Sequence, residues 1–330
     1  MAESDDERLE RIFHPYATEQ MEAFVKRQPD PTQVSFVHYT SAEAALRILQ
    51  KKRIWMRNVT CMSDYSEVQH GFNLLNEVLF KDDSKGLKAL NAAVDGCAAG
   101  AADEAIQFFN KWSTDIRFNT YITSISEHDD DEDQHGRLSM WRAFGGTDVR
   151  IALVFKFPFS LLFGNTFNLV ISPVAYLGKE EVERELYRVV ETIHQNRDFL
   201  SALGRERVIR ATYNMLVAGA TCLKHKGFSE EREWRLIYAP VRWPSPLIEP
   251  STEVIRGIPQ IVYKIPLDAN IPGAPESLTK LDLARLFHHL IIGPALYPYS
   301  MIEAFGTALQ NAGVSEPTTR IVLSGIPIRM

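Results

Sequence analysis

Two short motifs, far apart in the chain, hold the residues whose types and spacing could do chemistry. Residues 38–40 read His-Tyr-Thr at the end of an apolar run, and residues 231–235 read Glu-Arg-Glu-Trp-Arg at the start of another. Side chains on a strand repeat every two residues, so Glu231 and Glu233 are predicted to share a face. Paired carboxylates recur where a developing positive charge is stabilised. The alternative is a solvated edge strand whose acids pair with the neighbouring arginines.

Composition narrows the class of protein. The chain has 330 residues, of which 45% are hydrophobic and 24% charged, with a net charge of −6, so neither nucleic-acid nor anionic-membrane binding is indicated. The acidic N-terminus lacks the features of a secretory signal, and no apolar run is long enough to span a membrane. Three widely spaced cysteines form no Cys-x-x-Cys pair. We therefore expect a cytoplasmic protein that does not cross a membrane.

The predicted elements are strands scattered among helices at irregular spacing, a pattern typical of an α+β fold. An N-terminal helical arm is expected over residues 1–32, followed by a single α+β domain over 33–330 with helical insertions near 66–115 and 179–226. The predicted strands are Val34–Tyr39, Ile54–Met56, Asn119–Ser126, Val149–Phe157, Glu233–Ala239, Ile261–Ile265 and Leu290–Ile292, with further strands near Ile321 and Ile326.

Metal-binding patterns are weak. The acidic segment Glu127–Asp133 has the first spacings of a calcium loop, but Gln134 stands where that loop needs glycine and Met140 where it needs glutamate. A solvated loop is the better interpretation. His288 and His289 are consecutive, so on a strand their side chains are expected to point apart. The sequence therefore predicts no metal.

Taken in chain order, three features resemble the site residues of the ADP-ribosyltransferase superfamily: a histidine closing the first strand, the hydroxyl-rich strand 123–126, and Glu-x-Glu opening a late strand. The wider pattern is similar to a bacterial domain-of-unknown-function family that is distantly similar to that superfamily and linked to defence or toxin systems. The stretches that carry this resemblance are Phe36–Thr40, Ile122–Phe144, Phe228–Tyr238, Ile291–Pro294 and Ser324–Arg329.

The resemblance implies a split mixed β-sheet core with inserted and flanking helices, and NAD as the substrate. Cleavage of the nicotinamide–ribose bond leaves positive charge on the ribose, which a carboxylate stabilises. Glu233 would be this carboxylate, His38 would bind the ribose hydroxyls, and Glu231 would activate the acceptor. The remaining NAD-binding residues implied are Tyr39 against the nicotinamide, Thr40 or Ser124 at its carboxamide, Ser126, Trp141, and Arg142 and Arg235 as diphosphate or carboxylate partners. Core packing is the competing interpretation for Trp141.

Three functions follow as alternatives. The first is an ADP-ribosyltransferase-like enzyme acting on a protein or nucleic-acid acceptor without a metal. The second is a non-catalytic module of the same fold that binds a nucleotide or a partner protein. The third is a nuclease or other hydrolase in a defence system, for which the acidic segment and the glutamate pair would have to bind magnesium. The sequence specifies neither the acceptor nor the oligomeric state.

Overall fold

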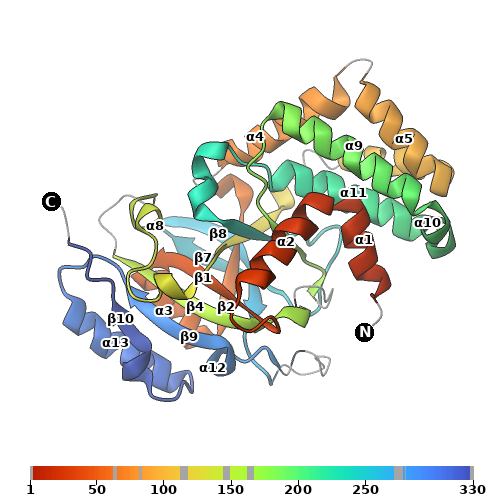
Figure 1. The fold of residues 1–330 in the computed structure, drawn as a ribbon. Coiled ribbons are helices and arrows are strands. Elements are labelled where there is room, and N and C mark those ends of the chain that lie inside the picture. The colour runs from red at the N-terminus through yellow and green to blue at the C-terminus, as the bar shows by residue number, and fades with distance from the viewer. Residues whose placement is uncertain are drawn as a thin grey trace.

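A large mixed sheet and a layer of helices organise this α+β fold. The computed structural model describes residues 3–61, 65–81, 84–111, 118–143, 149–161, 167–270, 278 and 280–327. Figure 1 shows the sheet with helices α3, α8, α12 and α13 around it at the lower left, and the layer that contains α4, α5, α9, α10 and α11 at the upper right. Among the described residues, no helix is long and apolar enough to cross a membrane.

Ten strands of the described residues form the sheet, and most neighbours along it run antiparallel. Its main path is β10-β9-β4-β1-β3-β2-β8-β7, and β6 pairs with both β3 and β5. Among the pairs of strands that the structure describes, only β9 and β10 run parallel. The strands are β1 Gln33–Ser41, β2 Arg53–Asn58, β3 Tyr121–Glu127, β4 Arg150–Pro158, β5 Val170–Pro173, β6 Glu233–Tyr238, β7 Glu249–Ile255, β8 Ile258–Pro266, β9 Phe287–Ile292 and β10 Ile321–Leu323.

The sheet divides along one edge of β3. Strand β6 pairs with residues 121–126 of β3, so it occupies the opposite edge throughout. On the remaining edge, β1 pairs only with Ser126 and Glu127, whereas β2 pairs with Tyr121 and Ile122. Residues 123–125 lie between these two pairings. The point where β1 and β2 separate is referred to below as the split.

The helical insertions form one layer rather than two. A continuous hydrophobic cluster joins Leu75, Leu90, Phe109, Leu186 and Leu216, which come from both parts of the chain. The helices are α1 Asp5–Phe13, α2 Pro15–Arg27, α3 Ala42–Lys51, α4 Tyr65–Leu75 with its π-helical continuation Asn76–Phe80, α5 Lys85–Cys97, α6 Ala101–Lys111, α8 Leu138–Ala143, α9 Lys179–Gln195, α10 Arg197–Leu203, α11 Arg205–Thr221, α12 Leu283–Leu286 and α13 Pro298–Asn311.

The N-terminal arm is docked at both of its ends. Helix α1 begins with a capping box between Ser4 and Glu7, which satisfies backbone N–H groups at its start. Arg8 donates two hydrogen bonds to Asn196 at the end of α9, at 2.8 and 3.2 Å. Phe24 of α2 is fully buried against Phe36 of β1, at 5.1 Å between ring centroids. The arm therefore joins the helical layer to the sheet.

Most predicted strands are confirmed, with longer bounds for β1 and β2 than predicted. The strand expected near Ile326 is wrong, because that residue lies outside any regular element. Strands β5 and β7 were not predicted. Helix α12 is a single turn, since β9 already begins at Phe287. Phe144 and Arg329, the last residues of two of the motif stretches, lie outside the described residues.

The acidic segment is not the solvated loop that its composition predicts. Its centre forms the 3-10 turn η3, Asp130–Glu132. Arg232 forms ion pairs with Asp129 and Glu132, and Arg137 donates to both carboxylate oxygens of Glu132 at 3.0 Å. Arg137, which is close by in the sequence, and Arg232, which is far from it, therefore hold the segment in place.

Candidate functional site

Glu233 lies at the centre of a buried polar cluster on β6. Its side chain retains 5% of its exposure. Carboxylate oxygen Oε1 accepts hydrogen bonds from Ser124 Oγ at 2.5 Å and Arg235 Nε at 2.8 Å. The second oxygen, Oε2, accepts from Lys224 Nζ at 3.2 Å. Both oxygens are therefore engaged by donors, and two of the three donors are cationic.

The surroundings of Glu233 keep it ionised. Burial by itself raises the pKa of this carboxyl group, but the charges of Arg235 and Lys224, with the hydrogen bonds from Arg235 and Ser124, outweigh burial and lower the pKa to about 2. Glu233 is thus an anion at every physiological pH. A fixed anion of this kind is what stabilisation of a positive transition state requires.

Glu231 joins the cluster through Lys224. It is the last residue of the 3-10 helix η6, Lys226–Glu231, so it does not lie on the strand. Arg232, between the two glutamates, has a left-handed backbone with φ of 42°. The expectation that strand alternation places both carboxylates on one face is therefore wrong. Lys224 Nζ brings them together instead, since it also donates to Glu231 Oε2 at 2.6 Å.

His38 reaches the same cluster through the split. Val37 pairs with Ser126 and Ser126 pairs with Glu233, so these three side chains share one face of the sheet. His38 is the next residue after Val37, so its side chain leaves β1 on the opposite face of the sheet. Its Nδ1 lies 2.9 Å from the backbone oxygen of Ser124, at the part of β3 that β1 and β2 leave uncovered.

The tautomer of His38 follows from its environment. Burial lowers the pKa of His38, although its contact with the Ser124 backbone opposes this effect, so the ring is neutral at neutral pH. A carbonyl oxygen accepts only, so Nδ1 must carry the proton and donate to Ser124. Nε2 then keeps a lone pair and can accept a hydrogen bond, for example from a sugar hydroxyl.

Tyr39 and Trp141 form a separate packing unit. Their rings meet edge to face at 5.0 Å between centroids, and both side chains are buried. Tyr39 Oη accepts from the backbone N–H of Arg137 at 2.8 Å, and Trp141 Nε1 donates to the oxygen of His135 at 2.8 Å. Burial raises the pKa of Tyr39 to about 12. These contacts fasten α8 to β1.

Replacing Tyr39 by phenylalanine tests this packing role. The change leaves the partly buried N–H of Arg137 without its acceptor, so we expect the free energy of unfolding to fall by about 1–3 kcal/mol. Urea denaturation followed by circular dichroism measures the difference. The matched control is Tyr187→Phe, whose ring is 41% exposed on α9 and whose loss of a hydroxyl should change stability little. Equal stability of both variants would contradict the role.

The other predicted residues fall into three groups. Ser124, Arg235 and Ser126 lie with Glu233; Arg235 is 2% exposed and also donates to the backbone oxygen of Thr221. Thr40 is half-buried on β1, opposite Ile151 of β4. Arg142 is exposed on α8.

Sequence reasoning missed two members of the cluster. Lys224 is 2% exposed and contacts both glutamates. It falls within the helical insertion predicted near 179–226, but the last helix of that insertion, α11, ends at Thr221. The hydroxyl oxygen of Tyr176 accepts a hydrogen bond from the backbone N–H of Glu233 at 3.0 Å. Neither residue belongs to a motif. The lysine's position among apolar neighbours, in Cys-Leu-Lys-His, was the only signal in the sequence for burial of a charge.

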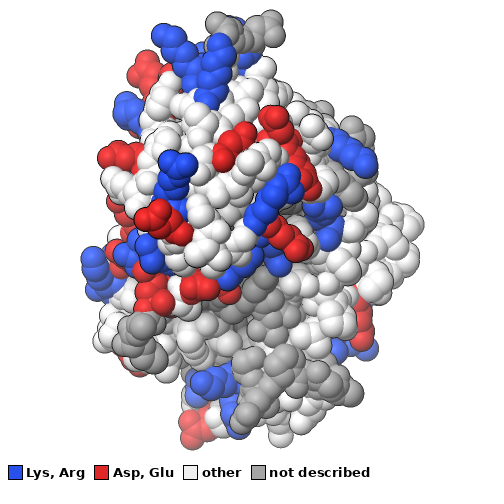
Figure 2. Space-filling view, turned by 90° about the vertical axis from the view of Figure 1, so that its right-hand side faces the viewer, with Lys and Arg blue, Asp and Glu red and all other residues white. Residues whose placement is uncertain are grey.

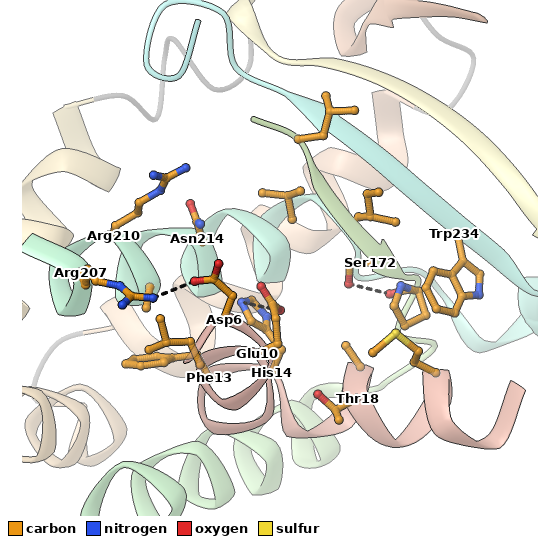
Figure 3. Close-up of a pocket in the computed structure, with 18 residues that line it drawn as sticks. Asp6, Glu10, Phe13, His14, Thr18, Ser172, Arg207, Arg210, Asn214 and Trp234 are labelled. Carbon is orange, nitrogen blue, oxygen red and sulfur yellow. Dashed lines mark hydrogen bonds and ion pairs between the residues drawn. The ribbon is translucent and has the colours of Figure 1, made fainter. Parts of the chain in front are cut away.

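One cavity adjoins the cluster from the other side of β6. It has a volume of about 180 Å³ and lies between α1, α2, α11 and β5, with Trp234 in its wall. Figure 3 shows Arg207, paired with Asp6, at one end and Trp234 with Ser172 at the other. Neither Glu233 nor His38 lines it. Ligand pockets usually measure about 300–1,000 Å³, so this cavity is too small for a dinucleotide.

Comparison with known proteins adds one finding. Residues 140–236 match a family described as "Protein of unknown function (DUF2971)". The match covers less than a third of the chain and includes Glu231, Glu233 and Arg235, while His38 and Ser124 lie outside it. No curated protein and no solved structure matches the chain.

Proposed function

We propose that this protein is an ADP-ribosyltransferase-like enzyme that cleaves NAD and transfers ADP-ribose to a macromolecular acceptor. One observation carries the proposal. His38, Ser124 and Glu233 come from three strands, in the order in which the superfamily carries its site residues, and hydrogen bonds of 2.9 and 2.5 Å connect them. The connection crosses β3 where β1 and β2 separate, which is where a split-sheet transferase would hold NAD.

The proposed chemistry assigns each of these residues a task. As the nicotinamide–ribose bond breaks, nicotinamide leaves as a neutral molecule and the ribose gains positive charge. Glu233, ionised by its surroundings, stabilises that charge. Nε2 of His38 accepts a hydrogen bond from a ribose hydroxyl. Glu231, which is only partly buried, takes the proton that the acceptor loses when its nucleophile bonds to the ribose.

Substrate must displace one donor from Glu233. Lys224 is the natural one, because its ammonium group is shared between Glu231 at 2.6 Å and Glu233 at 3.2 Å. Movement of Lys224 towards Glu231 removes the shorter of two hydrogen bonds to Oε2, the other being the one from Arg235 Nη2 at 3.4 Å. A ribose hydroxyl then takes the place of the ammonium group, and the lysine stays paired with Glu231. Residues 225–230, which follow Lys224, are all exposed, so this segment can shift without breaking a hydrophobic core.

The enclosure of Glu233 favours a second candidate. The carboxylate is almost fully buried and balanced by Arg235 and Lys224, an arrangement that buried structural ion clusters also show. A non-catalytic module that binds a nucleotide or partner protein would need no access to Glu233. On the face shown in Figure 2, basic and acidic side chains are interspersed, so that face carries no continuous basic patch of the kind that binds nucleic acid.

Binding of NAD tests the proposal without requiring the acceptor. We expect titration calorimetry to detect NAD binding to the wild type and a roughly tenfold weaker affinity in His38→Ala, since one hydrogen bond contributes about 0.5–1.5 kcal/mol. The control is His194→Ala, a histidine exposed on α9, which should bind as the wild type does. No detectable binding by the folded wild type would contradict the proposal, and binding that is equal in His38→Ala would remove His38 from it.

A further inference from the structure

A second cluster of potential ligands lies outside the Glu233 site. It consists of His128, just after β3, Asp133, just after η3, and His289 on β9. His128 Nε2 lies 2.7 Å and His289 Nε2 lies 3.5 Å from the same oxygen, Asp133 Oδ1. The histidine side chains are 1% and 8% exposed, whereas that of Asp133 is 40% exposed. Two buried imidazoles therefore meet one carboxylate that borders solvent.

A β-bulge places His289 in this cluster. The register between β4 and β9 shifts so that Val154 faces His289 while Phe155 faces Phe287, which leaves His288 as the extra residue. The expectation that consecutive histidines point apart is therefore wrong here. Their rings lie 4.9 Å apart, and their Nδ1 atoms are 2.7 Å apart.

Each histidine has a partner suited to orient it as a ligand. If His289 Nδ1–H donates to Nδ1 of His288, its Nε2 keeps a lone pair and faces Asp133. His128 Nδ1 is buried without a hydrogen-bond partner, and Glu132 Oε2 lies 3.7 Å from it. An Nδ1–H at that position would point towards a carboxylate, as metal-bound histidines commonly do. His289 Nε2 is likewise buried without a hydrogen-bond partner.

The spacing of the three atoms suits a small divalent ion. Ligand atoms at about 2.0–2.2 Å from a tetrahedral metal lie roughly 3.3 Å from one another. The ligand atoms here all lie within 4.8 Å of one another, so side-chain adjustments of about 1 Å suffice.

We propose that His128, Asp133 and His289 bind a divalent first-row transition-metal ion, with zinc as the ion of choice for their two nitrogens and one oxygen. The partly exposed side of Asp133 leaves room for water as a fourth ligand. The ion would fasten the acidic segment to β9, because His128 and Asp133 flank η3. This site is independent of the proposed NAD chemistry, since none of its ligands contacts Glu233.

Zinc titration of chelator-treated protein tests the site. We expect competition with a chromophoric chelator to give one bound zinc per chain, and zinc to raise the melting temperature. The affinity for zinc should fall at least tenfold in His289→Gln and in Asp133→Ala. Zinc should then raise the melting temperature of these variants less than that of the wild type. His194→Ala, which removes an exposed histidine far along α9, should bind as the wild type does. Cobalt should give a visible absorption band in the wild type and lose it in the two ligand variants.

Two results would overturn the metal site. One is the absence of stoichiometric zinc or cobalt binding by the folded wild type. The other is binding that Asp133→Ala retains in full. His289 is buried, so if His289→Gln does not fold, Asp133→Ala decides alone, because its side chain is partly exposed and its loss leaves the core intact.

Discussion

Replacing Glu233 by glutamine lowers the free energy of unfolding by about 3–5 kcal/mol, the range found when one partner of a buried ion pair is removed. The reason is specific to this cluster. Arg235 and Lys224 are 2% exposed, and glutamine removes the carboxylate charge that both of them contact, while Lys224 keeps Glu231. Glutamine keeps the size of the side chain, so the loss reports charge rather than a cavity. Chemical denaturation monitored by circular dichroism measures it.

The same variant should also change the dependence of stability on pH. The pKa of Glu233 falls from an ordinary 4.5 to about 2 on folding, so the unfolded chain binds the proton more readily. The stabilisation from this depressed pKa is complete above pH 4.5 and is lost as pH falls towards 2. It amounts to about 3 kcal/mol, at roughly 1.4 kcal/mol for each pH unit. Glu233→Gln should lack this part of the acid destabilisation.

Glu230→Gln is the matched control for Glu233→Gln. Glu230 is exposed on η6, three residues away, so the same chemical change there should alter stability by no more than about 0.5 kcal/mol. Combining Glu233→Gln with Lys224→Met should cost less than the sum of the two single changes, because each removes the partner of the other. Strict additivity, or a Glu233→Gln variant as stable as Glu230→Gln, would show that the cluster does not form.

The second large effect concerns catalysis. If Glu233 stabilises the ribose cation, glutamine at this position should slow release of nicotinamide from NAD by about 10²–10³-fold, the loss typical of removing one group that acts on the transition state. The rate must be compared at a temperature where both proteins are fully folded, because the variant is less stable. Ser124→Ala should cause a smaller loss, since it removes one of the two donors to Oε1 but leaves the charge.

The parts of the fold that could be predicted are those with a local signal. Strands β1, β3 and β9 carry runs of apolar and β-branched residues, and α9 and α11 have long amphipathic patterns. The order of His38, Ser124 and Glu233 along three strands was also readable from the sequence, because His38 ends one apolar run, Ser124 lies in a hydroxyl-rich strand and Glu233 opens another run. Strand β5 has four residues and only a short pattern, so its pairing with β6 depends on the rest of the sheet.

The parts of the site that could not be predicted depend on contacts between distant segments. Lys224 belongs to no motif, yet it joins Glu231 to Glu233. The composition of the acidic segment predicts a solvated loop, whereas in the structure ion pairs with Arg137 and Arg232 hold the segment in place. The approach of His289 to His128 depends on a β-bulge, which the strand rule of alternating faces does not anticipate. Tertiary contacts, rather than local propensity, decide each of these positions.

Release of nicotinamide from labelled NAD is the most direct test of the proposed function. Purified wild type, Glu233→Gln and Glu230→Gln should be incubated with NAD, alone and in cell extract, after circular dichroism has shown that each is folded. The account predicts nicotinamide release by the wild type and Glu230→Gln, with label transferred to an acceptor in extract, and a loss of at least 100-fold in Glu233→Gln. Folded wild type that releases no nicotinamide under either condition, or equal rates in all three proteins, would contradict it.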